Sequence, residues 1–215
     1  MIALIDYGAG NLTSVKKALT TLGVEFTVPD TPAACRGATG VIVPGVGHFS
    51  ATTALEKPWR DAITRAVECG TPLLGICVGM QWLYEGSEEA PDVPGLGVLS
   101  GRCRLLKGDT SQRLKIPHVG WNELVPPASE SQHDKGPRPF TGRLLTGVPP
   151  AAHVYFTHSF AAPVTTDCVA STTHAECFAA AVERGNVFGV QFHPEKSGDA
   201  GLKILRNFLE VCRQC

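Results

Sequence analysis

The sequence lacks the features that would direct it to a membrane or to nucleic acid. No apolar run in the 215 residues approaches the length of a membrane-spanning helix. The formal net charge is only -1, so we expect none of the basic surface that binds nucleic acid or an anionic membrane. Charged residues make up 18% of the chain and hydrophobic residues 43%, a balance typical of a soluble enzyme with a substantial core.

The N-terminus also lacks the marks of a targeting signal. Met1–Asp6 leads directly into an apolar strand, with no basic segment and no cleavage site. We therefore expect a cytoplasmic protein, and a length of 215 residues fits one domain over residues 1–215.

Disulfides are not expected, although the chain contains eight cysteines. A chain of this length, rich in core residues and without a signal peptide, favours reduced thiols. Cys212 and Cys215 form a lone C-x-x-C pair. A zinc site needs four ligands, and no second matching pair is evident, so we expect no metal.

The first half of the chain alternates strand and helix patterns, which predicts an α/β fold with a doubly wound, mostly parallel sheet. We expect strands at 2–7, 24–28, 41–43 and 73–76, and helices at 12–22, 50–57, 59–69 and 78–85, with a join or kink at Pro58. Asn11 is expected to cap the first helix.

After Gly95 the pattern changes to consecutive strands, which implies an antiparallel or mixed second half. The expected strands are 98–106, 115–125, 154–160, 168–171, 178–182 and 187–192. Residues 183–186 should form a tight hairpin, 126–142 a long polar surface loop, and 199–212 a closing helix.

The most informative stretch runs from Pro72 to Gln81. A short apolar run leads to Cys77, which Gly75 and Gly79 flank two residues away on each side. This spacing is typical of a nucleophile elbow, where neighbours without side chains let a strand turn sharply into a helix and leave the nucleophile accessible. The N–H groups that open the helix favour a thiolate or an oxyanion. A buried structural cysteine is the alternative.

Two further stretches can complete such a site. Residues 187–198 place His193 at the end of a buried strand and Glu195 two residues later, so an imidazole can accept the thiol proton while a carboxylate holds its tautomer. Residues 44–47, Pro-Gly-Val-Gly, expose backbone at the edge where open α/β sheets bind ligands, and can present an N–H to an oxyanion, although the loop taken alone is more simply explained as a plain turn. The turn at residues 8–11 is not a dinucleotide site, because Thr13 stands where the third glycine is required.

These motifs resemble the class I (triad-type) glutamine amidotransferases, which combine a Gly-x-Cys-x-Gly turn with a late His-Pro-Glu. More narrowly, the chain is similar to the glutaminase subunits of imidazole glycerol phosphate synthase, in histidine biosynthesis. The narrower resemblance rests on residues 5–12, 44–47, 75–81, 115–122, 155–160 and 191–198. It implies a flavodoxin-like, open mixed sheet flanked by helices.

The resemblance also implies roles for individual residues. Cys77 would attack the side-chain amide of L-glutamine, His193 would carry the proton, and Glu195 would orient His193. The remaining implied positions are the oxyanion hole at Gly45, Val46 and Val78, substrate contacts at Gly47, Gln81, Ser159 and Phe160, and a partner interface at Trp121, Asn122 and Lys196.

The implied partner is a (β/α)8-barrel cyclase that receives ammonia and makes imidazole glycerol phosphate and an aminoimidazole carboxamide ribotide. No nucleotide, metal, flavin or other cofactor is implied. His48 and Val78 depart from the usual family residues, and the loop at 126–142 is longer than usual. Trp121 could instead be a core residue.

Two alternatives stay open at this point. One is the glutaminase of another class I amidotransferase, such as the one that serves pyridoxal phosphate synthesis, which should lack Trp121, Asn122 and the opening at residues 8–11. The other is a non-catalytic flavodoxin-like module, which would need neither His193 nor Glu195.

Overall fold

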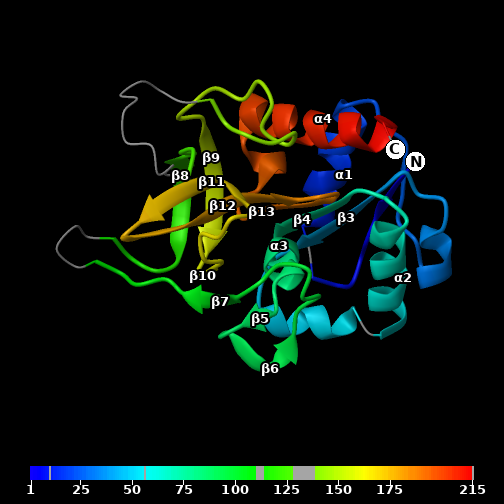
Figure 1. The fold of residues 1–215 in the computed structure, drawn as a ribbon, viewed down its shortest axis with the longest axis horizontal. Helices are drawn as coiled ribbons and strands as arrows, with labels where there is room; N and C mark the ends of the chain where they lie inside the picture. Colours follow the sequence, from blue (N-terminus) through cyan, green and yellow to red (C-terminus); the bar gives the residue numbers. More distant parts are fainter. Residues whose placement is uncertain (10, 56, 110–113, 128–138, 215) are drawn as a thin grey trace.

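The computed structural model describes residues 1–9, 11–55, 57–109, 114–127 and 139–214. Its centre is a seven-stranded sheet (Figure 1). In spatial order the strands are β11 (Cys168–His174), β12 (Glu176–Arg184), β13 (Val187–Val190), β4 (Leu73–Cys77), β3 (Gly40–Gly45), β1 (Ile2–Leu4) and β2 (Phe26–Thr27). The last five are parallel, and β12 and β11 continue the sheet antiparallel at one edge.

The three central strands position the chemistry. β3, β4 and β13 are buried along their whole length, as expected for strands covered on both faces. Gly45 pairs with Cys77, and Val190 pairs with Ile76. The C-terminal ends of all three strands therefore meet at one edge of the sheet.

Helices cover both faces of this sheet (Figure 1). α1 (Leu12–Thr21) and α4 (Gly198–Gln214) lie on one side, and α2 (Lys57–Glu68) and α3 (Val78–Leu83) on the other. Phe208 of α4 packs on Phe188 of β13, with 5.8 Å between the ring centroids. Short 3-10 helices join the layers: η1 (Pro32–Cys35), η2 (Phe49–Ala54) and η3 (Pro194–Lys196).

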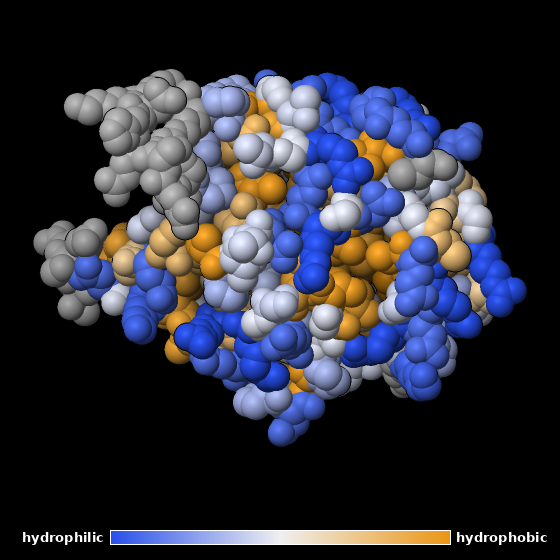
Figure 2. All heavy atoms as spheres, in the orientation of Figure 1, coloured by the Kyte–Doolittle hydropathy of each residue, from blue (hydrophilic) through white to orange (hydrophobic). Residues whose placement is uncertain are grey.

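Two smaller sheets extend the molecule beside the central one. One pairs β10 (Phe160–Ala161), β7 (Arg102–Leu105), β5 (Gly86–Ser87) and β6 (Ala90–Pro94), and the other pairs β8 (His118–Glu123) with β9 (His153–His158). On the face in Figure 2, hydrophobic surface gathers near the middle, while hydrophilic residues cover much of the rim. Within the described ranges, no helix has the length and apolar character needed to cross a bilayer.

The predicted fold class is confirmed, and the departures from the prediction are local. The hairpin of β5 and β6 was not predicted, because its strands are short and carry no alternating pattern. Residues 49–54 form a 3-10 helix, and Pro58 lies in the first turn of α2, where proline is tolerated, instead of kinking a longer helix. Asn11 precedes α1, but its side chain makes no capping hydrogen bond. Gly10, Cys215 and most of the predicted polar loop, residues 128–138, lie outside the described residues.

Candidate active site

Cys77 is the last residue of β4 and immediately precedes α3. Its φ is +54°, and it is only 3% exposed. A residue with a side chain rarely adopts positive φ. Holding it there costs about 1–3 kcal/mol, and such residues cluster at functional sites. The sharp strand-to-helix turn predicted from the sequence is present, with the cysteine at its tip.

Gly75 and Gly79 allow α3 to pack directly against the sheet. A Cβ added to Gly75 would lie 2.6 Å from the carbonyl oxygen of Gly79, and one added to Gly79 would overlap the carbonyl oxygen of Val43. Real side chains do not tolerate such contacts. The small residues on either side of Cys77 are therefore a steric requirement of the turn, as the sequence argument supposed.

His193 and Glu195 form a buried pair next to the end of β13. His193 Nδ1 and Glu195 Oε1 are 2.8 Å apart, and both side chains are about 2% exposed or less. Because the carboxylate can only accept, Nδ1 carries the proton of this hydrogen bond. Nε2 is also buried and finds no hydrogen-bond partner among the described residues. It is therefore the nitrogen that can exchange a proton.

The protonation of His193 depends on its two neighbours. Burial alone lowers the pKa of His193, but the neighbouring Cys77 and the hydrogen-bonded carboxylate of Glu195 together raise that pKa to about 10. Burial disfavours the charged imidazolium, whereas a thiolate on one side and a carboxylate on the other stabilise it. The raised pKa makes His193 a strong acceptor for the thiol proton of Cys77, which is the role of the base beside a cysteine nucleophile.

The loop after β3 contains the predicted oxyanion donors. Val46 N–H donates to the carbonyl of Ala9 at 3.2 Å, so this donor is engaged away from Cys77. Gly45 has no space for a side chain, since a Cβ there would lie 2.8 Å from Val78 Cβ and would overlap the Tyr7 hydroxyl. Of the predicted donors, Val78 N–H remains at the first residue of α3, where backbone donors lack helix partners.

A narrow cavity of about 40 Å³ opens beside Cys77. Its walls contain every residue predicted to contact substrate, which are Gly47, Gln81, Ser159 and Phe160, together with Val78. Gln81 Nε2 donates to the carbonyl of Phe160 at 2.8 Å. Gln81 Oε1 is buried and finds no hydrogen-bond partner among the described residues, so it can accept from a ligand in the cavity.

Sequence reasoning missed several residues around this cavity. Glu89 lines it from the unpredicted hairpin, and its Oε2 accepts from Phe49 N–H at 2.7 Å. His158 lines it from β9 and donates from Nδ1 to the carbonyl of Phe160 at 2.9 Å. Burial lowers the pKa of His158 to about 3, so this imidazole is neutral at physiological pH. Gln191, which contacts Cys77, could have been found, because residues i and i+2 share one face of a strand and His193 follows two residues later.

The predicted partner residues do not all behave alike. Trp121 is 56% exposed, which excludes a core role. Its ring lies 6.1 Å from the ring of Tyr155, and Lys196 Nζ lies 5.8 Å from that same ring, so the three side chains form one surface patch. Asn122 is turned toward the protein, because its Nδ2 donates to the carbonyl of Thr173 at 3.0 Å.

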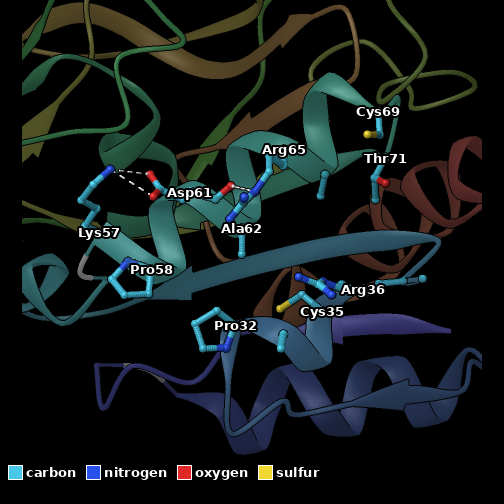
Figure 3. Close-up of a pocket in the computed structure, with 14 residues that line it drawn as sticks. Pro32, Cys35, Arg36, Lys57, Pro58, Asp61, Ala62, Arg65, Cys69 and Thr71 are labelled. Atoms are coloured by element: carbon cyan, nitrogen blue, oxygen red, sulfur yellow. Dashed lines mark hydrogen bonds and ion pairs between the residues drawn. The ribbon is translucent and has the colours of Figure 1, made fainter.

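A larger cleft of about 710 Å³ lies elsewhere, between η1 and α2 (Figure 3). It opens near the starts of β3 and β4, the opposite edge from Cys77, and no predicted site residue lines it. Three of its charged residues already contact one another: Lys57 Nζ lies 3.0 Å from the Asp61 carboxylate, and Arg65 Nε donates to the Asp61 carbonyl. The cleft therefore takes no part in the chemistry around Cys77.

Comparison with known proteins identifies the family of the chain. Residues 3–212 match the family described as Glutamine amidotransferase class-I. The chain is 44% identical to "Imidazole glycerol phosphate synthase subunit HisH" of Moorella thermoacetica, over 99% of this chain and 95% of the relative. It is 43% identical to the protein of the same name from Xanthomonas euvesicatoria, over 98% and 97%.

Solved structures share the fold at lower identity. A crystal structure of a glutamine amidotransferase superposes with a TM-score of 0.73 at 21% identity, covering 99% of this chain and all of the other. The structure of PurLQS from Thermotoga maritima gives a TM-score of 0.67 at 21% identity, with 97% of each chain covered.

Proposed function

The chain belongs to the class I glutamine amidotransferases and, among them, to the HisH subunits of imidazole glycerol phosphate synthase, and from this premise we propose how its site works. It is an enzyme, the glutaminase subunit that hydrolyses L-glutamine to L-glutamate and ammonia for histidine biosynthesis. We propose further that residues 1–215 are a single amidotransferase domain and that the protein is cytoplasmic.

The reaction begins with the thiol proton of Cys77. Transfer of that proton to His193 Nε2 leaves a thiolate, which attacks the side-chain carbonyl carbon of glutamine. The tetrahedral intermediate then breaks its C–N bond, while His193 returns the proton to the departing ammonia. A γ-glutamyl thioester remains on Cys77. Water, deprotonated by His193, hydrolyses this thioester and releases glutamate. Glu195 holds the imidazole by its Nδ1–H throughout.

Substrate recognition is assigned to the walls of the narrow cavity. Gln81 Oε1 and the Glu89 carboxylate supply acceptors suited to the α-ammonium group of glutamine. Ser159 and Phe160 lie on the same wall and would hold the α-carboxylate end, while Gly47 leaves backbone open to the substrate. The negative charge that develops on the carbonyl oxygen would be stabilised by the N–H groups of Val78 and, after the loop reorients, Val46.

Ammonia serves a partner subunit of imidazole glycerol phosphate synthase. We propose that this partner is a (β/α)8-barrel cyclase, which uses the ammonia to make imidazole glycerol phosphate and an aminoimidazole carboxamide ribotide. The exposed patch of Trp121, Tyr155 and Lys196 is the proposed docking surface. The carbonyl of Tyr155 accepts the backbone N–H of His193 at 2.9 Å, so this surface is one hydrogen bond from the catalytic base.

The buried thiol, imidazole and carboxylate at the edge of the sheet are the observation that carries the proposal. Cys77→Ala should abolish glutamine-dependent synthesis by the complex and leave synthesis from added ammonium salts intact, because the cyclase site belongs to the other chain. Loss of both activities in a folded complex would contradict the assignment. A role in pyridoxal phosphate synthesis would be indicated if the chain bound that synthase and not the cyclase. Unchanged function after Cys77→Ala would indicate a non-catalytic module.

A further inference from the structure

Gln191 is buried between the nucleophile and the substrate-binding wall. Its Nε2 donates to Cys77 Sγ at 3.7 Å, and its Oε1 accepts from Gln81 Nε2 at 3.1 Å. The residue is completely buried, at 0% exposure. Its side chain therefore links two residues of the site directly.

The carbonyl of Phe160 determines the direction of each hydrogen bond in the series that runs from Phe160 through Gln81 and Gln191 to Cys77. A carbonyl oxygen can only accept, so Gln81 must turn its NH2 group toward Phe160. The same NH2 group then donates to Gln191 Oε1. That contact leaves Gln191 its own NH2 group to direct at the sulfur of Cys77. No other orientation of the two amides satisfies all three contacts.

We propose that Gln191 is a further catalytic residue of the proposed glutaminase site, whose side-chain N–H stabilises the Cys77 thiolate and connects it to Gln81. When the thiol proton moves to His193, the sulfur gains a full negative charge inside a buried site. A hydrogen bond to a charged acceptor is roughly twice as strong as one between neutral groups. The contact therefore strengthens as the nucleophile forms.

The same series of hydrogen bonds makes the nucleophile responsive to substrate. Gln81 lines the cavity and its Oε1 has no hydrogen-bond partner among the described residues, so an ammonium group that hydrogen-bonds to this oxygen polarises the Gln81 amide. Hydrogen bonds in series strengthen one another, so Gln81 donates more strongly to Gln191, and Gln191 in turn to the sulfur. Occupancy of the substrate site thereby promotes the thiolate.

The test is alkylation of Cys77 by iodoacetamide across a range of pH, followed by mass spectrometry. Iodoacetamide carries no α-amino acid group, so its reaction reports on the sulfur and not on glutamine binding. In Gln191→Met, which keeps the volume and removes the donor, the rate profile should move to higher pH by about one to two units. Gln191→Glu replaces the donor with a carboxylate and should move it at least as far.

Two further variants separate the proposal from simpler explanations. Gln81→Met should shift the profile in the same direction by a smaller amount, whereas a Gln81 that only binds substrate would leave the reaction with iodoacetamide unchanged. Gln214→Met, at an exposed position of α4, is the matched control and should react like the wild type. Circular dichroism and thermal unfolding establish which variants are folded.

Wild-type profiles in the folded Gln191 variants would overturn the proposal. If Gln191→Met does not fold, Gln191→Glu, which keeps the side-chain shape, decides the question together with Gln81→Met. The outcome is independent of the proposed function: a wild-type protein that fails to hydrolyse glutamine would refute the glutaminase, while the shift in alkylation would still measure the contact of Gln191 with sulfur.

Discussion

Replacing Val46 by glycine is expected to raise glutamine hydrolysis by the isolated subunit. Val46 N–H donates to Ala9, so it must turn over before it can stabilise an oxyanion at Cys77. Reversal of the peptide between Gly45 and Val46 changes ψ of Gly45 and φ of Val46 by about half a turn, since these two bonds carry the peptide plane. The φ of Val46 is not positive in the present arrangement. The reversed arrangement therefore requires a positive φ at a β-branched residue.

The size of the effect follows from two opposing quantities. One missing oxyanion donor typically lowers the rate by about 10²–10³, equivalent to roughly 3–4 kcal/mol. A positive φ costs a residue with a side chain about 1–2 kcal/mol, and glycine avoids that cost. Val46→Gly should therefore recover roughly 5- to 30-fold of the lost rate. The rest of the lost rate reflects the hydrogen bond between Val46 and Ala9. A partner that binds the reversed loop more tightly than the present one can restore it.

Steady-state glutamate release is the appropriate measurement, for the subunit alone, with the cyclase, and with cyclase plus its nucleotide ligand. Wild-type turnover should rise along this series, and Val46→Gly should start higher and rise less. Val164→Gly, at an exposed valine that is not part of the site, is the control for the substitution itself. Near-equal wild-type turnover in all three conditions would refute the switch. Turnover of folded Val46→Gly within twofold of wild type would refute the role of this residue. Gly45→Ala is not a suitable test, because its Cβ would disturb Tyr7 and the turn after Cys77.

Three further predictions concern the triad, the neighbouring histidine and the turn. Glu195→Gln should lower turnover by about 10²–10⁴ and lower the pKa of His193, visible in the pH profile of glutamine hydrolysis, because the carboxylate no longer stabilises the imidazolium. Burial lowers the pKa of His158 to about 3, so the unfolded chain takes up that proton first as pH falls below about 6.5. From pH 7 to pH 5 this histidine should remove about 2 kcal/mol from the free energy of unfolding. In urea titrations, the free energy of unfolding of His158→Gln should fall by less over this pH range. An equal fall would contradict the buried neutral imidazole. Gly79→Ala should reduce the melting temperature strongly or prevent folding, since its Cβ would overlap the carbonyl of Val43, and a native melting curve would contradict this packing.

The sequence predicted the nucleophile turn well, because its determinants are local. Gly75 and Gly79 are separated from Cys77 by one residue each, and both prove to be positions where a side chain cannot fit. The pairing of His193 with Glu195 is equally local, since Pro194 alone lies between them and both side chains turn inward. Neither feature depends on knowing how distant parts of the chain pack.

The features missed from the sequence depend on distant contacts. Glu89 reaches the cavity only because β5 and β6 fold as a hairpin against β7. A strand of two residues is too short to show an alternating pattern of apolar and polar residues. The engagement of Val46 with Ala9 joins two loops that follow different strands. Asn122 follows the exposed Trp121 and was expected at the surface with it, but a hydrogen bond to a carbonyl of β11 holds its side chain inward. Propensity and spacing carry no information about such pairings.

The place of β13 beside β4 has a consequence for protein synthesis. Cys77 ends β4 and His193 lies just beyond the end of its neighbour β13, yet more than half of the chain separates the two residues, and the ribosome delivers the thiol first. At typical elongation rates of about 5–20 residues per second, His193 is synthesised roughly 10 s after Cys77. Until β13 docks, the nascent polypeptide carries an ordinary thiol, without the imidazole and carboxylate that activate it. A translation product that stops before β13 therefore contains the nucleophile's turn but cannot consume the cell's glutamine.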